Sequence, residues 1–130
     1  MATNGKEYLL LDVIAATLKY VSEDALTFAN TTTITPLTSS DIKWVVTVPA
    51  IWKAGAKSFM RKAAHKAGMI TDVSSDKLLL ALEPEAAAFQ TIADPHSGFR
   101  AAVESGLAAT GKEFMVLDAG GGTVDITVHR

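Results

Sequence analysis

Two short apolar runs with an amphipathic stretch between them constrain the fold of this chain most strongly. Residues 42–48 are β-branched and aromatic, and they stop at Pro49, which cannot donate to a sheet ladder. Residues 78–82 read Leu-Leu-Leu-Ala-Leu, a run too short for a helix and typical of a buried strand. Because strands joined through helices pack in layers, the pattern predicts an α/β fold, a mixed sheet with flanking helices.

The segment between these two strands has the spacing of a helix. Its apolar residues recur at i, i+3, i+4, i+7, i+8 and i+11, namely Ala56, Phe59, Met60, Ala63, Ala64 and Ala67. Gly68 stands where a left-handed C-cap is expected. The other face carries the basic side chains Lys53, Lys57, Arg61, Lys62, His65 and Lys66. We interpret these as a solvated helix surface rather than a patch for phosphate or acidic partners.

Two further helices are predicted on either side of these elements. The first runs from Tyr8 to about Val21, with an extension toward Phe28. The second runs from Glu85 to about Ala93, behind a proline whose fixed φ suits the first helical position. The Thr- and Ser-rich residues 30–40 suit an exposed loop. Residues 94–98 are typical of a turn, and the segment from there to Gly111 fits either a short helix or a loop.

The last element has the pattern of a β-hairpin. Residues 114–117 form an apolar run, residues 118–122 a glycine-rich turn, and Val124, Ile126 and Val128 alternate with polar residues. Unpaired edges and apolar strips are association sites. We therefore expect these three side chains to be exposed, or buried against another copy of the chain.

Composition excludes several classes of function. The 130 residues suffice for one domain, and 48% of them are hydrophobic, so a buried core is expected. A net charge of -2 gives no basic field for nucleic acid or an anionic membrane. Without cysteine the chain has neither disulfides nor thiolate zinc ligands, and we expect a cytoplasmic location. Asp12, Thr17 and Lys19 interrupt the first apolar run, which disfavours a secretory signal or a membrane span.

The glycine-rich turn carries the clearest chemical signal. Gly120, Gly121 and Gly122 allow positive φ and bring backbone N–H groups close to an anion, for which a phosphate is the natural candidate. Asp118 precedes the turn, and Thr123 and Asp125 follow it. Because carboxylates beside a polyanion imply a bridging cation, the sequence favours Mg²⁺ there. A flexible hairpin turn, with Asp118 accepting local hydrogen bonds, remains the alternative.

A second candidate carboxylate is Glu83, which lies at a strand-to-helix junction immediately before Pro84. A side chain there can project from the end of a sheet into a crevice. The alternative is an ordinary first-turn carboxylate favoured by the helix dipole. We expect Glu83, Asp118 and the glycine turn to gather at one end of the sheet, since each ends a strand or begins the next element. The three histidines show no spacing typical of metal ligands.

Three motifs in register resemble the seventy-kilodalton heat-shock chaperone family. They are Val-Val-Thr-Val-Pro-Ala at 45–50, Leu-Glu-Pro-Glu-Ala-Ala-Ala at 82–88 and Asp-Ala-Gly-Gly-Gly-Thr-Val-Asp at 118–125. Ile-Trp-Lys after the proline turn, and Glu85 where the main family has threonine, resemble its divergent twelfth-type branch. The resemblance implies part of an actin-like, ribonuclease-H-like ATPase domain. Residues 1–112 would end its first lobe, and residues 113–130 would form the opening hairpin of its second.

The resemblance also implies roles for particular residues. It makes Gly120, Gly121, Gly122 and Thr123 a phosphate loop for ATP or ADP. Asp118 would be the carboxylate near Mg²⁺ and the attacking water, and Glu83 a carboxylate next to the catalytic centre that reaches the metal through water. Thr123 and Asp125 complete the implied catalytic group. Pro49 matches a proline implicated in nucleotide-dependent signalling in the family. Lys57 falls where the main family commonly has the arginine that relays this signal, and lysine keeps the positive charge but lacks the planar guanidinium group.

Much of the family's site is missing from these residues. No Asp-x-Gly-Thr-Thr loop precedes the first helix, and neither the adenosine-binding glycine loop, the catalytic lysine nor the peptide-binding domain is present. The resemblance thus implies a fragment of a chaperone-like ATP-hydrolysing domain, inactive alone, whose partners are nucleotide, the remainder of a parent protein and client or co-chaperone proteins. The alternative is a nucleotide-sensing protein of the same fold without turnover. An actin-like or sugar-kinase relative lacks a matching signature.

Overall fold

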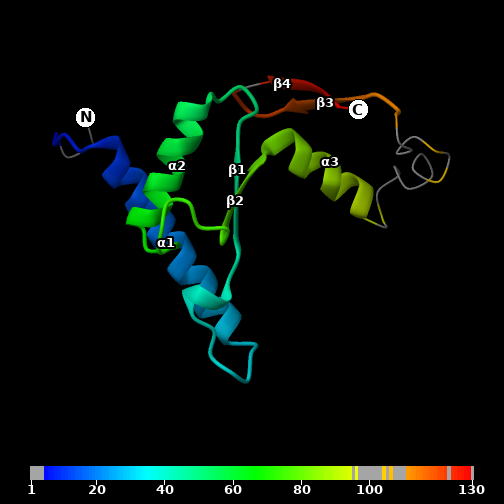
Figure 1. The fold of residues 1–130 in the computed structure, drawn as a ribbon. Helices are drawn as coiled ribbons and strands as arrows, with labels where there is room; N and C mark the ends of the chain where they lie inside the picture. Colours follow the sequence, from blue (N-terminus) through cyan, green and yellow to red (C-terminus); the bar gives the residue numbers. More distant parts are fainter. Residues whose placement is uncertain are drawn as a thin grey trace. The chain divides into compact units, whose positions relative to one another are not determined.

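The computed structural model describes residues 5–94, 96, 104, 106, 111–122 and 124–129. In chain order they form α1 (Leu10–Asn30), the 3-10 helix η1 (Ser39–Asp41), β1 (Trp44–Val48), α2 (Ala54–Lys66), β2 (Leu78–Leu82), α3 (Glu83–Ala93), β3 (Phe114–Ala119) and β4 (Val124–His129) (Figure 1). The chain divides into two compact units. The first comprises Met1–Val46 and Trp52–Leu80, and the second Thr47–Ile51 and Ala81–Arg130.

The first unit is built on the packing of α1 against α2 (Figure 1). The apolar face predicted for α2 is confirmed, because Met60, Ala63 and Ala64 are its buried residues. Gly68 ends this helix with φ +80°, as the C-cap prediction requires, and its N–H donates to the carbonyl of His65 at 3.0 Å. The predicted first helix is confirmed and extends to Asn30.

A small apolar core holds the first unit together. Its buried side chains come from α2, the following turn and β2, and they are Ala64, Ala67, Met69, Ile70 and Leu78. Leu18 from α1, Trp44 and Val46 from β1, and Leu80 from β2 pack against this cluster. The hydrophobic effect at this cluster therefore fixes the helix pair onto the strands.

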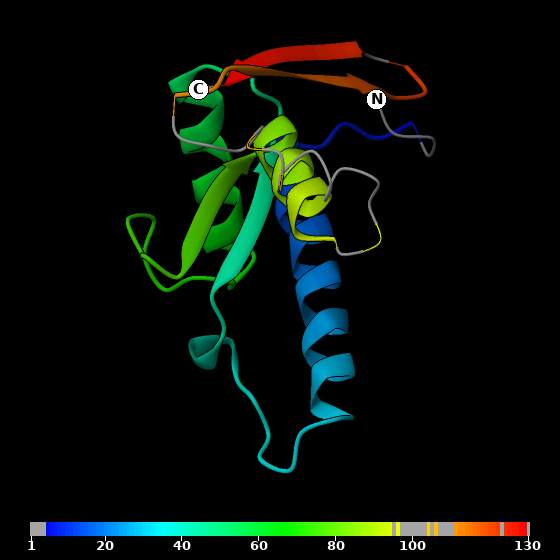
Figure 2. The same cartoon turned by 90° about the vertical axis from the view of Figure 1, so that its right-hand side faces the viewer.

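The strands β1 and β2 pair as a two-stranded sheet. They run in the same direction, as expected for strands joined by a helical crossover (Figure 2). The pair is also tied at its start, where the N–H of Trp44 donates to the carbonyl of Lys77 at 2.7 Å. The first three residues of each strand belong to the first unit and the last two to the second.

The second unit contains α3 and the hairpin of β3 and β4. α3 follows β2 without a loop, so Glu83 is its first residue, and Pro84 lies buried in its first turn. β3 and β4 pair antiparallel with Phe114 opposite His129 and Ala119 opposite Val124. The predicted hairpin is therefore confirmed, and both of its strands contact α3.

One expectation about the sheet differs from the structure. In the described residues the four strands form two separate two-stranded sheets, β1 with β2 and β3 with β4, rather than one mixed sheet. Local patterns identify strands but do not determine which distant strand each one pairs with. Most of residues 99–111, for which helix and loop both remained open, lie outside the described residues.

Candidate phosphate and cation site

The register of the hairpin sorts its side chains onto two faces. Met115, Leu117 and Ala119 pair with Val128, Ile126 and Val124, and these six residues form what we call the apolar face. Its larger side chains, Met115, Leu117, Val124, Ile126 and Val128, are all 59–70% exposed. The predicted exposure of the alternating Val124, Ile126 and Val128 is therefore confirmed.

The opposite face is polar toward the glycine turn. Here Phe114 stacks on His129 with ring centroids 5.3 Å apart, and His129 Nε2 lies 2.8 Å from the hydroxyl of Thr127. Next to the turn, Asp118 pairs with Asp125 across the strands. Asp118 is exposed and Asp125 half-buried.

The pairing of Asp118 with Asp125 brings two like charges together. Side chains directly opposite in an antiparallel pair have Cβ atoms about 4.5–5.5 Å apart, and like charges there destabilise the pair. Neither carboxylate has an ion-pair partner among the described side chains. A cation between the two would remove the repulsion, and carboxylate oxygens are the ligands that Mg²⁺ prefers.

The turn between the two aspartates differs from expectation in its backbone. Neither Gly121 nor Gly122 lies in the left-handed region, although positive φ was the expected reason for glycine there. A Cβ added at either position would meet no atom within 4 Å. Packing within the described residues therefore does not require glycine, and the turn leaves open space beside its backbone. Thr123, the predicted hydroxyl of this loop, lies outside the described residues.

Glu83 lies at the start of α3, half-buried, in the predicted strand-to-helix junction. The single sheet end that was expected to gather Glu83 and Asp118 is not formed, because β2 and β3 belong to different sheets. Among the described residues, no group of three His, Asp or Glu side chains could hold a metal ion. A site shared by Glu83 and Asp118 stays a prediction.

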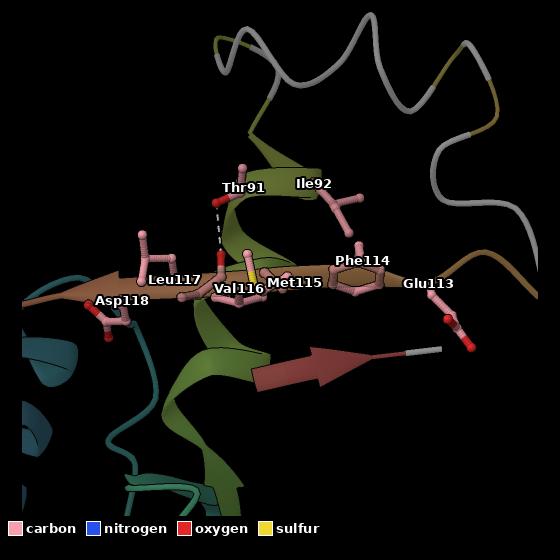
Figure 3. Close-up of a pocket in the computed structure, with 10 residues that line it drawn as sticks. Thr91, Ile92, Glu113, Phe114, Met115, Val116, Leu117 and Asp118 are labelled. Carbon is pink, nitrogen blue, oxygen red and sulfur yellow. Dashed lines mark hydrogen bonds between the residues drawn. The ribbon is translucent and has the colours of Figure 1, made fainter. Parts of the chain in front are cut away.

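A cavity of about 570 Å³ lies between α3 and β3. Ala87, Ala88, Thr91 and Ile92 line it from the helix, and residues 113–118 line it from the strand and the residue before it. In Figure 3 the side chains of Leu117 and Asp118 point to opposite sides of β3. The Thr91 hydroxyl donates to the carbonyl of Ala87 at 2.9 Å, so this polar group is satisfied within the helix. The cavity is mainly apolar, and Asp118 lies at one end of its lining.

Sequence analysis missed the role of Arg61, which it assigned to a solvated basic face. Its guanidinium is half-buried and donates to three backbone carbonyls: Val73 at 2.6 Å, Leu78 at 2.9 Å and Ser75. Lys66 on the same helix pairs with Asp12 of α1. The one available signal was the arginine itself, whose planar fork matches clustered carbonyls better than lysine does.

Comparison with known proteins identifies relatives along almost the whole chain. The chain is 34% identical to heat shock 70 kDa protein 12A of Mus musculus over an alignment of 171 positions, gaps included, which covers 99% of this chain and 25% of the relative. The human 12A protein gives the same identity and coverage. Human heat shock 70 kDa protein 12B is 35% identical over 172 residues, again with 99% and 25% covered. The chain thus spans about a quarter of the length of these relatives.

These similarities define the class to which the chain is related. It is a homologue of the seventy-kilodalton heat-shock proteins, which implies a region of the actin-like ATPase fold. Within that class the chain corresponds to part of a domain of the twelfth type, as the resemblance of its motifs indicated.

Two other comparisons gave no relatives. No protein-family model matches the chain, and no solved structure matches it. Separately, no helix in the described residues has the length and apolar character needed to cross a membrane.

Proposed function

We propose that this chain supplies one part of a nucleotide site, the part that holds phosphate groups and their cation. The observation that carries the proposal is the pairing of Asp118 with Asp125 at the base of a three-glycine turn. Backbone N–H groups freed of side chains can approach a phosphate, and two carboxylates beside them can hold the cation that bridges to it. Homology to the heat-shock 70 kDa proteins supports the same assignment.

Each residue has a distinct task in this proposal. Gly120, Gly121, Gly122 and Thr123 contact phosphate oxygens of ATP or ADP. Asp118 and Asp125 face Mg²⁺, which keeps several of its waters in such sites. Glu83 reaches the same centre through water. When bound, Mg²⁺ supplies neutralisation of phosphate charge, while Asp118 orients a water molecule and accepts its hydrogen bond.

The fit of these residues to magnesium and phosphate rests on donor chemistry. Two carboxylates satisfy the preference of Mg²⁺ for one or two protein carboxylates plus water and phosphate oxygens. The open space beside Gly121 and Gly122 leaves room for an anion at the backbone. Both features are local to the hairpin.

The activity proposed for a family-length protein is nucleotide hydrolysis, with a nucleotide-sensing role without turnover as the second candidate. The second candidate is favoured by the run Ile51-Trp52-Lys53, which replaces a polar run in the main family. In both cases the remainder of a family-length chain is a partner, client or co-chaperone proteins are further partners, and the location is cytoplasmic. The 130-residue chain itself is not expected to turn over ATP.

Titration of the ¹⁵N-labelled chain with ATP, ADP and MgCl₂ tests the binding half of this proposal. Amide shifts should change at residues 118–125 when nucleotide and Mg²⁺ are both present, with a Kd weaker than about 1 mM because a partial site binds weakly. Gly121→Val should abolish the shifts by placing a side chain beside the backbone N–H groups, and it should not unfold the chain, since a Cβ there meets no atom within 4 Å. Gly55→Ala, remote on α2, is the matched control that should leave them unchanged.

The outcome that would overturn the proposal is equally specific. Absence of shifts at the hairpin up to saturating Mg²⁺ and nucleotide, or shifts insensitive to Gly121→Val, removes the phosphate assignment. Robust turnover by the 130-residue chain that Asp118→Ala abolishes would instead show that the site is complete. A turnover assay is therefore run on the same samples.

A further inference from the structure

The loop that joins α1 to η1 is unusually rich in threonine. Residues 31–38 read Thr-Thr-Thr-Ile-Thr-Pro-Leu-Thr, and every residue of this loop except Leu37 is exposed. The loop projects beyond the end of α1 (Figures 1 and 2). An exposed hydroxyl either takes part in the hydrogen bonds of the fold or is left available for chemistry. The hydrogen bonds of these five threonines separate the two cases.

The ends of the loop are held together by one side chain. The amide nitrogen of Asn30 donates to the carbonyl of Leu37 at 3.1 Å, and the N–H of Leu37 donates to the Asn30 Oδ1 at 2.7 Å. Both residues are half-buried. This pair of hydrogen bonds closes the segment between them into a loop with fixed ends. Ile34, in the middle of that segment, is fully exposed.

Four of the five threonine hydroxyls serve the fold. The hydroxyls of residues 31–33 donate to the last carbonyls of α1 at 2.7–3.4 Å, where a helix end leaves acceptors free. Thr38 precedes η1, and its hydroxyl donates to Asp41 at 2.6 Å. Within the described part of the chain the hydroxyl of Thr35 has no hydrogen-bond partner. Thr35 is therefore the one threonine of the loop whose hydroxyl the fold does not use.

Thr35 is also the threonine that precedes a proline. The ring of Pro36 fixes its φ and leaves no backbone N–H. A groove that receives this residue can be wholly apolar, because it has no N–H to satisfy, and this distinguishes proline from every other residue. Residues 25–40 contain no charged side chain. An enzyme that recognises acidic or basic neighbours thus finds none near Thr35, and the proline is the recognition feature.

We propose that Thr35 is a phosphorylation site for a proline-directed serine/threonine protein kinase, with ATP as the phosphoryl donor. The Thr35 Oγ1 attacks the γ-phosphorus of ATP, and a bond forms between them. The bond from that phosphorus to the bridging oxygen breaks, and ADP leaves with its electron pair. The hydroxyl proton passes to the general base of the kinase. Thr35 belongs to the first unit, so this modification does not depend on the phosphate site proposed in the second.

The loop can accept a phosphate at Thr35 without loss of structure. The hydroxyl makes no hydrogen bond in the described chain, so its modification breaks none. A phosphate adds a charge of about −1.5 to −2 at pH 7, and residues 25–40 contain no carboxylate to repel it. Modification of Thr38 would have the opposite effect. It would remove the hydrogen bond to Asp41 and place two anions side by side.

Phosphorylation of the folded 130-residue chain tests the assignment. The chain is incubated with Mg²⁺, ATP and a purified proline-directed kinase, with an acid-directed and a base-directed kinase in parallel. Fragmentation mass spectrometry should locate one phosphate on Thr35 with the first enzyme and none with the other two. Amide NMR shifts should change only near the loop, because no hydrogen bond of α1 or η1 is lost.

Variants of the loop separate the hydroxyl from its recognition. Thr35→Val should remove the phosphate, whereas Thr35→Ser should keep it. Pro36→Ala should slow the reaction at least about 10-fold, since an apolar pocket loses that much when a methylene is missing. Thr33→Ala is the matched control and should leave the rate unchanged, because that hydroxyl is bonded to the helix end. Far-UV circular dichroism checks that each variant keeps its helices.

Three results would overturn the proposal. They are a folded chain that takes no phosphate from the proline-directed kinase, a phosphate located mainly on Thr38 or the serines of η1, and a rate that Pro36→Ala leaves unchanged. Site location on the unsubstituted chain decides the first two even if a variant fails to fold. Loss of the α1 amide signals on phosphorylation would likewise contradict a hydroxyl that the fold does not use.

Discussion

Arg61 illustrates how a single side chain can connect a helix with the loop that leads into the next strand. Its guanidinium donates to the carbonyls of Val73, Ser75 and Leu78, which together close residues 73–78 onto α2. Backbone carbonyls in a half-buried turn need donors, and one arginine supplies three. The charge of Arg61 therefore serves the fold of the first unit rather than a ligand.

Removal of the Arg61 guanidinium should destabilise the chain measurably. Arg61→Ala leaves carbonyls without donors and should lower the free energy of unfolding by about 1–3 kcal/mol. Arg61→Lys should recover only part of this, because an ammonium group cannot reproduce the planar fork. Urea denaturation followed by circular dichroism is the measurement. Lys62→Ala, the exposed neighbour, is the control and should stay within about 0.5 kcal/mol of wild type.

Two exposed aspartates should titrate below the ordinary range. The hydroxyl and N–H of Thr38 donate to Asp41 at 2.6 and 2.9 Å, and these hydrogen bonds lower the pKa of Asp41. Hydrogen bonds from the hydroxyl and N–H of Ser74 lower the pKa of Asp72 in the same way. Since unfolded aspartate titrates near about pH 3.9, this local stabilisation is complete above that pH and is lost as the pH falls through the lower folded pKa values.

Carbon-detected NMR titration of the side-chain carboxyls measures these pKa values directly. Thr38→Ala should raise the pKa of Asp41 toward the ordinary range, because it removes the hydroxyl donor and leaves only the backbone N–H, and it should leave the pKa of Asp72 unchanged. Ser74→Ala should do the reverse. An Asp41 titration that Thr38→Ala does not alter would show that the hydrogen bonds are not the cause.

At the scale of elements, α2 has one glycine in its first turn and another just past its C-terminal end. Gly55 lies in the first turn with ordinary φ, whereas Gly68 ends the helix at φ +80°, and a Cβ at either position would meet no atom within 4 Å. Gly55→Ala should therefore raise the free energy of unfolding by up to about 1 kcal/mol, and Gly68→Ala should lower it by about 1 kcal/mol. Thermal and urea unfolding of the two variants are compared. Equal effects of one sign would contradict the backbone explanation.

The elements themselves were predictable because their signals are local. The strand of residues 78–82 and the cap at Gly68 follow from short patterns that the structure reproduces. Pairing of distant strands was not predictable, and the single mixed sheet was wrong, since periodicity does not determine partners. Within the candidate site, the opposition of Asp118 and Asp125 follows from a short turn. The contacts of Glu83 depend on long-range packing that no local pattern contains.

At the scale of the whole molecule, the buried side chains are concentrated in one place. The core cluster belongs to the first unit, whereas the hairpin leaves one face 59–70% exposed. A two-stranded hairpin is at best marginally stable unless other elements cover it. We therefore expect the two units to differ in local stability.

Native-state hydrogen exchange should detect this difference. Amides of α2 around Ala63 and Ala64, which are almost fully buried, should exchange at least about 10-fold more slowly than those of β3 and β4. The measurement is made residue by residue with NMR. Uniform protection across both units would show that the hairpin is stabilised as strongly as the core.

The two units are interleaved along the chain. The second unit takes Thr47–Ile51 from between two segments of the first, so the backbone passes from one unit to the other after Val46, after Ile51 and after Leu80. Neither unit is therefore a continuous stretch that a protease or a gene truncation could release intact. A cut after Leu80 would take away Ala81 and Leu82, the end of β2, and so shorten the strand with which β1 pairs. Shortening the chain would therefore not separate the glycine hairpin from the helical core. An experimenter would have to join the segments of the second unit in a new order, for example by circular permutation.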